Sequence, residues 1–245
     1  FTWMNGKAAM TDRNEDHREK FCNYVSLRNR SYEKVIELGS GPFTNLRLIL
    51  EHASASEVHL LDPLMNDYLE HEYCRYKKGR LGGVLTTSII PYSCKGGFKH
   101  PLRFLRHKYN EWRVGGLFGK NITMHPCAIE DFESDEKFDL VVMINVIEHC
   151  RDIEVIFEKI KNMLNVGGTF VYSDKMYDSD EELERSTYQF DAGHPLRVDR
   201  KVISKFLDDN FVSELHNYMS KESVLSCGEK MRSQYEYFVG RYIGG

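Results

Sequence analysis

The sequence predicts an α/β protein built on a doubly wound, mostly parallel seven-stranded sheet, with a basic, aromatic insertion. Short apolar, β-branched runs alternate with longer segments of helical spacing along most of the chain, which is typical of strands joined by helices in a parallel sheet. The first strand runs into a glycine turn in VIELGSGPFTNL, residues 35–46. The second ends at an acidic residue, as strands do at the ligand-binding edge of such sheets.

Each element follows from a local pattern. The first strand stops at Gly39, the second at Asp62-Pro63, and the segment GGTFVYS is opened by two glycines. Apolar runs of strand length lie at 34–38, 57–61, 121–126, 138–144, 167–173, 211–215 and 235–243. Apolar residues at helical spacing predict helices at 12–28, 43–53, 64–76, 152–164 and 199–208.

Composition sets limits on the class of protein. We expect a helical cap at 1–32 and one α/β domain at 33–245, because 41% hydrophobic residues can form a core of this size. The chain contains no run of about 18 apolar residues, so we expect no membrane span. The polar N-terminal segment does not resemble a secretory signal. The six cysteines form no CxxC pair, so we expect reduced thiols, a cytoplasmic protein and no metal site.

The glycine turn indicates the class of ligand. A dinucleotide site has the pattern G-x-G-x-x-G, but Thr44 stands where the third glycine belongs after Gly39 and Gly41. The chain also has no G-x-x-x-x-G-K-[ST] phosphate loop. Asp62 ends the second strand 21 residues after Gly41, and its carboxylate can accept hydrogen bonds from both hydroxyls of a ribose. These features predict an adenosine-containing ligand.

Four motifs in this order resemble one family. ELGSGP, LLDP, FDLVVMINVIEH and LNVGGTFVYSD, spread over residues 33–175, are similar to the motifs of class I (Rossmann-like) S-adenosylmethionine-dependent methyltransferases. The runs DPLMNDY and NVIEH resemble those of small-molecule methyltransferases of bacterial type. The resemblance implies S-adenosylmethionine as the cofactor and transfer of its methyl group.

The resemblance also implies the cofactor-binding residues. Glu37 would contact the amino end of the methionine through water or backbone. Gly39, Ser40 and Gly41 would pass under the methionine and ribose, and Asp62 would hold the ribose hydroxyls. The remaining implied contacts are Pro63 and Leu64 beside the adenine, Ala128 and Ile129 against it by backbone and packing, and Asn145 and Val146 beneath the sulfonium and methyl.

Methyl transfer from a sulfonium is mostly a positioning task, and a general base is needed only if the acceptor keeps its proton at neutral pH. His149 and His194 are the candidate catalytic residues. The alternative for His149 is a structural role, ordering its loop and capping the next helix. The alternative for His194 is a turn histidine in a Gly-His-Pro loop. Cys127 and Cys150 are near the site in sequence, but a free cysteine is usually a small buried hydrophobe.

The segment 75–120 differs most from the rest of the chain in its charge. It holds 11 Lys and Arg against one acid, Glu111, so the remaining residues carry a net charge of about −14. Seven aromatic residues lie in the same segment: Tyr76, Tyr92, Phe98, Phe104, Tyr109, Trp112 and Phe118. We favour a lid or wall that binds an anionic small molecule. The alternatives are a nucleic-acid platform, an amphipathic helix on a membrane or partner, and a solvated basic face, including one at a homodimer contact.

The predicted function is therefore methyl transfer to an oxygen or nitrogen of a small, anionic acceptor. Tyr68, six residues after the ribose acid, and Arg197, in FDAGHPLRVDRKV, are predicted to contact this substrate; the alternative for Arg197 is an ion pair at the start of the next helix. The alternative functions are an RNA or protein methyltransferase that docks through the insertion, and a non-catalytic cofactor-binding partner protein. NVIE follows the fourth strand where an Asp/Asn-Pro-Pro-Tyr signature would stand, which disfavours nucleic-acid bases as acceptors.

Overall fold

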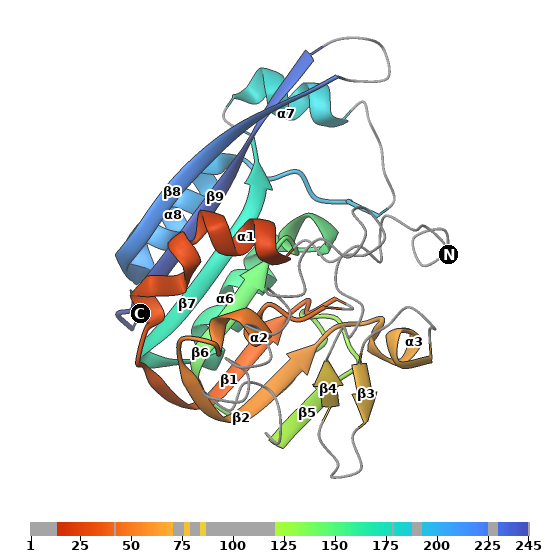
Figure 1. The fold of residues 1–245 in the computed structure, drawn as a ribbon. Coiled ribbons are helices and arrows are strands. Elements are labelled where there is room, and N and C mark those ends of the chain that lie inside the picture. The colour runs from red at the N-terminus through yellow and green to blue at the C-terminus, as the bar shows by residue number, and fades with distance from the viewer. Residues whose placement is uncertain are drawn as a thin grey trace, which may run out of the picture. The chain divides into compact units, whose positions relative to one another are not determined.

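The computed structural model (Figure 1) describes residues 14–41, 43–70, 76–78, 84–86, 121–177, 179–187, 193–224 and 230–244. The chain divides into two compact units, residues 1–127 and 128–245. The large sheet has seven strands in the order β5-β2-β1-β6-β7-β9-β8, so the predicted α/β fold with a mostly parallel sheet is confirmed. The division into a cap at 1–32 and a domain at 33–245 stays a prediction.

The first unit contributes three parallel strands in the order β5-β2-β1. Its elements are α1 (Asn14–Lys20), the 3-10 helix η1 (Cys22–Leu27), β1 (Ser31–Leu38), α2 (Leu46–Ile49), β2 (Ser54–Leu61), α3 (Met65–Glu70), β3 (Tyr76–Lys78), β4 (Val84–Thr86) and β5 (Asn121–His125). Strands β3 and β4 pair antiparallel in a separate small sheet. They lie within the predicted insertion, most of which is outside the described residues.

Strands β1 and β2 bring two predicted site segments to the same edge. Their carboxyl halves are fully buried and pair in register up to Leu38 and Leu61. The glycine turn therefore begins beside Asp62, as expected where parallel strands end together.

The helices of the first unit are shorter than predicted. The backbone takes positive φ at Cys22, Asn23 and Tyr24, so the helix predicted at 12–28 ends at Lys20 and a 3-10 helix follows. Only Leu46–Ile49 of the predicted 43–53 helix is α-helical. Tyr24, Leu46 and Ile49 are nevertheless fully buried, whereas Val25, in the same predicted helix as Tyr24, is 49% exposed.

The second unit contributes β6, β7, β9 and β8, in that order. Its elements are β6 (Phe138–Ile144), the 3-10 helix η2 (Ile147–His149), α6 (Ile153–Met163), β7 (Leu164–Met176), α7 (Asp180–Thr187), α8 (Arg200–Asn210), β8 (Phe211–Val224) and β9 (Lys230–Tyr242). Strands β6 and β7 are parallel, whereas β9 runs antiparallel to both β7 and β8. Strands β8 and β9 form a long ribbon that extends well beyond the predicted strands (Figure 1).

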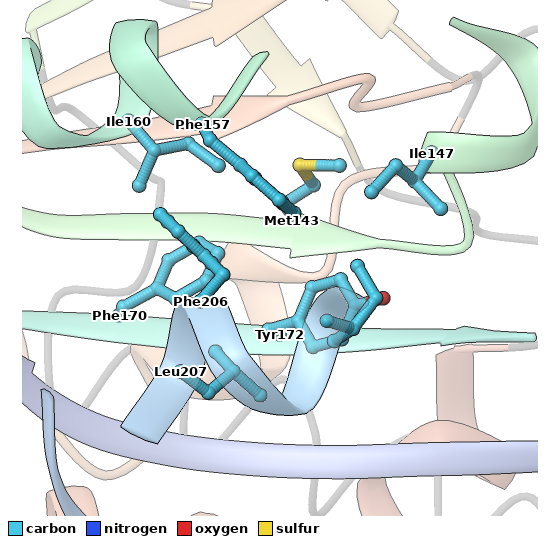
Figure 2. A pocket seen from close by; sticks show the side chains of 9 residues that line it. Met143, Ile147, Phe157, Ile160, Phe170, Tyr172, Phe206 and Leu207 are labelled. Carbon is cyan, nitrogen blue, oxygen red and sulfur yellow. The ribbon is translucent and has the colours of Figure 1, made fainter. Parts of the chain in front are cut away.

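The core of this unit is closely packed. Side chains from β6, β7, α6 and α8 meet in one apolar cluster (Figure 2). The rings of Phe157 and Phe206 stack with centroids 3.9 Å apart. The space between these side chains does not admit a water-sized sphere, so it serves packing rather than ligand binding. In the part of the chain that the structure describes, no helix is long and apolar enough to cross a membrane.

Candidate functional site

The glycine turn after β1 is locked to the end of β2. Gly39 and Gly41 have φ of 66° and 57°, the left-handed region that glycine enters without steric cost. The amide of Gly41 donates to Oδ2 of Asp62 at 2.9 Å, and the amide of Leu64 donates to Oδ1 at 2.9 Å. The Asp62 carboxylate, 6% exposed, thus fixes both the turn and the start of the α3 segment.

This turn leaves room for a ligand against its backbone. Apart from the two chain neighbours of Gly41, no described residue has an atom within 4 Å of the place a Cβ would take there. Carboxylate oxygens accept hydrogen bonds from hydroxyl groups, and the predicted contact of Asp62 with a ribose stays a prediction. Pro63 is exposed and Leu64 half-buried, and their predicted place beside the adenine stays a prediction.

Glu37 lies behind this turn. Its side chain is 1% exposed, and Oε1 accepts from the amide of Asn45 at 2.9 Å and from its side-chain nitrogen at 3.0 Å. Oε2 accepts from the hydroxyl of Thr44 and from the amide of Leu46 at 3.3 Å. Burial raises the pKa of Glu37 to about 7, although these hydrogen bonds favour the charged form. The carboxyl therefore organises the start of α2; its predicted contact with the methionine end stays a prediction.

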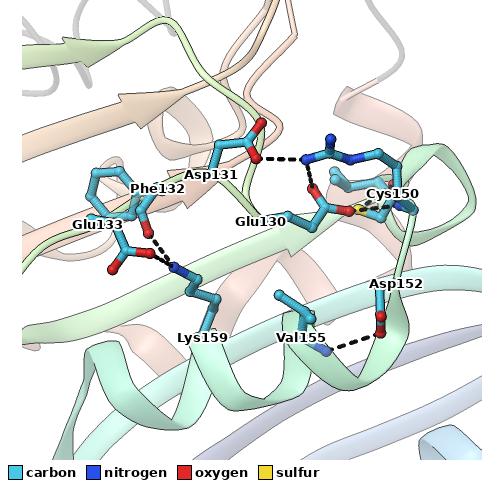
Figure 3. A network of polar contacts seen from close by, with 10 residues as sticks. Glu130, Asp131, Phe132, Glu133, Cys150, Asp152, Val155 and Lys159 are labelled. Atoms are coloured by element: carbon cyan, nitrogen blue, oxygen red, sulfur yellow. Dashed lines mark hydrogen bonds and ion pairs between the residues drawn. The ribbon is translucent and has the colours of Figure 1, made fainter.

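In the second unit, the predicted adenine segment is a tight turn. The amide of Asp131 donates to the carbonyl of Ala128 at 3.1 Å, and Ile129 is 3% exposed. The backbone amide of Arg151 donates to the carboxylate of Glu130 at 2.6 Å. The guanidinium of Arg151 donates to the carboxylate of Asp131 at 2.8 Å (Figure 3). The turn is thereby fastened to the segment that precedes α6.

The end of β6 is held by a buried carboxylate. Asp174, fully buried in β7, accepts from the amides of Val146 at 2.7 Å and Ile147 at 2.6 Å. Burial, helped by the charge of Glu148, raises its pKa to about 7. Asn145 enters this bend with φ of 58°. The predicted floor residues, Asn145 and Val146, are therefore rigidly placed.

The structure brings the two candidate catalytic histidines together. The rings of His149 and His194 have centroids 4.4 Å apart. Nδ1 of His149 lies 2.5 Å from the carbonyl oxygen of Gly193, and Nε2 of His194 lies 3.7 Å from Oε1 of Glu148. The amide of Leu196 donates to the carbonyl of Glu148 at 3.2 Å. Sequence analysis missed Glu148, which precedes His149 in NVIEH and would have been found by pairing each histidine with its acidic neighbours.

The structure also bears on the alternative roles predicted for Arg197 and His149. Arg197 donates to the carbonyls of His194 and Leu196, so at least part of its guanidinium orders its own loop. The next helix after His149 is capped by Asp152, so the helix-capping alternative for His149 is not what the structure shows.

Cys150 is buried, and burial raises the pKa of its thiol. The side chain of Tyr68, in α3, lies outside the described residues.

Comparison with protein families decides the assignment. A family model described as a methyltransferase domain matches residues 11–210, which is most of the chain. The chain belongs to the class I S-adenosylmethionine-dependent methyltransferases. This confirms the family predicted from the four motifs. It also makes S-adenosylmethionine the cofactor.

Solved structures show the same fold at low identity. The methyltransferase matches the YcgJ protein from Bacillus subtilis with a TM-score of 0.56 and 9% identity, over 94% of this chain and 100% of that one. It matches the N-methyltransferase NodS from Bradyrhizobium japonicum, solved with S-adenosyl-L-homocysteine, with a TM-score of 0.52 and 13% identity over 98% of both chains. TehB from Haemophilus influenzae matches with a TM-score of 0.51 and 13% identity over 93% of this chain, which spans 62% of TehB. No curated protein matches the chain.

Proposed function

We propose that this methyltransferase transfers a methyl group to an oxygen or nitrogen of a small, anionic acceptor. The proposed cofactor site is supported by the contact between Asp62 and the glycine turn. The backbone amide of Gly41 donates to Oδ2 of Asp62 at 2.9 Å, which holds the turn in place. We assign the ribose hydroxyls to Asp62 and the methionine to the backbone of Gly39, Ser40 and Gly41. The other proposed cofactor contacts are Glu37, Pro63, Leu64, Ala128, Ile129, Asn145 and Val146.

The acceptor half of the proposal rests on charge. The segment 75–120 has ten net positive charges in a chain of net charge −4, and Arg and Lys bind carboxylates and phosphates through charge-assisted hydrogen bonds. Tyr68 and Arg197 are proposed to contact the same acceptor. Arg197 orders its loop through the two carbonyl contacts described above, and we propose the same guanidinium as the group that meets the charge of the acceptor.

His149 and His194 are proposed to take the acceptor's proton when the acceptor is a hydroxyl. The carbonyl of Gly193 at 2.5 Å from Nδ1 of His149 requires a proton on that nitrogen, which assigns the basic lone pair to Nε2. His149 is exposed and His194 is half-buried, so both are accessible. An amine acceptor would need neither histidine.

The test is calorimetric titration of the chain with S-adenosylmethionine, repeated with Asp62→Ala. We expect the substitution to weaken binding by about 2–4 kcal/mol, because it removes the acceptor of the ribose hydroxyls and the anchor of the turn. Asp67→Ala, which changes an exposed acid in the same segment, is the matched control and should bind as the wild type does. Equal binding by the Asp62 and Asp67 variants would remove Asp62 from the site.

Turnover identifies the acceptor. When S-adenosylmethionine carries a labelled methyl group, we expect the label to appear in small carboxylates or phosphorylated compounds that have a hydroxyl or an amine. Label in RNA or protein instead would favour an enzyme that docks through the segment 75–120. Binding with no transfer to any of these classes would favour a non-catalytic partner protein. For a hydroxyl acceptor, His149→Gln and His194→Gln should lower kcat while leaving cofactor affinity unchanged.

We also propose a cytoplasmic setting. Among the described residues, Cys22, Cys127 and Cys150 form no disulfide, which agrees with a reducing compartment. A homodimer formed through the basic segment stays an alternative use of that segment, and the mass of the chain in solution tests it.

A further inference from the structure

We propose that Glu148, His149 and His194 form a binding site for a divalent transition-metal cation such as Zn²⁺. One ligand atom from each of these side chains lies within 4.8 Å of the other two, the one such group of three found among the described residues. Two imidazoles and one carboxylate are one of the ligand sets of three-ligand zinc sites, which keep a fourth position open. Imidazole ligands also favour Zn²⁺ and its neighbours over Mg²⁺ and Ca²⁺.

The distances require only a small adjustment. Zinc bonds of about 2.0–2.1 Å place tetrahedral ligand atoms about 3.3 Å apart, and Nε2 of His194 is already 3.7 Å from Oε1 of Glu148. The rings of His149 and His194 are 4.4 Å apart between centroids. A bound cation would require the side chains of these half-buried or exposed residues to rotate so that the ligand atoms come closer together.

The surroundings of the cluster match those of a ligand set. A metal-bound histidine usually donates its other ring nitrogen to a carbonyl or carboxylate, which fixes its tautomer; Nδ1 of His149 lies 2.5 Å from the carbonyl oxygen of Gly193 and makes a contact of this kind. Arg197 donates to the carbonyl of His194 itself. The amide of Leu196 bonds the carbonyl of Glu148, so the two segments that supply the ligands are tied together.

The backbone beneath the cluster is also fixed. Asp174 accepts from the amides of Val146 and Ile147, directly before Glu148. The ligands therefore come from a rigid bend, which reduces the entropy lost when a cation binds. Sequence patterns of zinc sites rely on short ligand spacings, whereas His194 lies 45 residues after His149. No metal was expected from the sequence because the cysteines form no CxxC pair, and ligands this far apart were not considered.

A cation here would act on an acceptor in a different way from a general base. A bound Zn²⁺ lowers the pKa of a coordinated hydroxyl or water, so an acceptor could lose its proton while both imidazoles remain ligands. The inference goes beyond the proposed function and does not depend on it, because cation binding is measured on the chain alone.

The test is titration of the chelator-stripped chain with Zn²⁺ against a chromophoric competitor. We expect one Zn²⁺ per wild-type chain. Glu148→Gln and His194→Ala should each weaken binding by at least about 10-fold, since even outer-sphere changes have effects of that size. The matched control is His125→Ala, which removes one imidazole from the close pair His59 and His125 in the first unit, and should bind zinc as the wild type does. Circular dichroism confirms that each variant is folded.

Substitution of Co²⁺ for Zn²⁺ identifies the ligand atoms. Nitrogen and oxygen ligands give visible d–d bands without sulfur-to-metal charge transfer. No tight zinc binding, equal binding by all variants, or bands from cysteine sulfur would each overturn the inference. A chain that binds S-adenosylmethionine but not zinc overturns this inference alone, whereas a chain that binds zinc but not S-adenosylmethionine overturns the proposed function alone.

Discussion

Asn145 directly follows strand β6 and adopts the left-handed conformation, with φ of 58°. Its amide donates to the carbonyl of Ser173 at 2.7 Å, so the bend is part of the sheet and not a mobile loop. Asparagine tolerates this conformation better than other residues with a Cβ, and glycine tolerates it best. Asn145 is also one of the proposed floor residues beneath the cofactor, where a strained backbone has functional meaning.

Two substitutions at Asn145 distinguish the effect of its backbone conformation from that of its side chain. Asn145→Ala should lower the free energy of unfolding by about 1 kcal/mol, whereas Asn145→Gly should cost less because it relieves the strain. Urea denaturation measures both. If the asparagine side chain itself contacts the cofactor, the glycine variant will be stable yet bind S-adenosylmethionine more weakly. Equal stability of the alanine and glycine variants would show that φ at this position carries no strain.

Glu37 gives the chain a pH-dependent stability. Its pKa is raised by burial from an ordinary 4.5 to about 7, so between these values the native state binds more protons than the unfolded chain. The contribution of this carboxyl to stability is fully present below pH 4.5 and is lost as the pH rises through about 7.

The measurement compares the wild type with Glu37→Gln, which cannot titrate. The free energy of unfolding of the wild type should fall relative to that of the variant as the pH rises from 4.5 to 7, by at most about 3 kcal/mol. Denaturation at a series of pH values gives the difference, in which the other titrating groups cancel. A constant difference across this range would mean that Glu37 keeps an ordinary pKa in the folded chain.

At the scale of whole elements, the buried strands were the most predictable part of the molecule. Strand β6 was predicted at 138–144 and lies there, because a continuous apolar run bounded by polar residues has few other solutions. Helix α7 was missed, since Leu183 is the single apolar residue of DEELERST. The outer halves of β8 and β9 were missed because their residues are largely polar. Their extension comes from pairing with each other, which no local pattern records.

Helix α6 shows how a local signal sets an element boundary. Its N-cap is Asp152, whose carboxylate accepts from the amides of Glu154 at 2.9 Å and Val155 at 3.2 Å. Asp152→Ala should lower the free energy of unfolding by about 1 kcal/mol, and Asp152→Ser should recover most of it because serine also caps helices. Asp135→Ala, at an exposed position before β6, is the control in the same denaturation experiment. A loss no larger than that of the control would show that the cap is dispensable.

For the molecule as a whole, the cofactor motifs were predictable because each lies within a few residues of a strand end. The glycine turn and Asp62 meet because β1 and β2 pair in parallel register. The cluster of Glu148, His149 and His194 was not predictable, because it depends on how the loop before α8 folds back onto η2. The sequence named both histidines separately but contained no signal that they touch.

The uneven distribution of charge makes a prediction for the intact enzyme. Ten net positive charges lie in residues 75–120 and about −14 elsewhere. If the segment attracts an anionic acceptor, added salt will screen the attraction, because the Debye length falls from about 10 Å at 0.1 M to about 3 Å at 1 M. The KM for the acceptor should then rise by roughly threefold or more over this range, whereas the KM for S-adenosylmethionine, which carries a sulfonium cation, should not rise in parallel.

A double variant tests whether the segment itself is responsible. Arg103→Gln with Arg106→Gln should raise the KM for the acceptor at low salt and reduce its dependence on salt. The matched control, Lys201→Gln with Lys205→Gln on helix α8, removes the same charge from the second unit and should behave as the wild type. If both double variants shift the KM equally, the attraction belongs to the net charge of the protein. If neither does, the acceptor is not recognised by its charge.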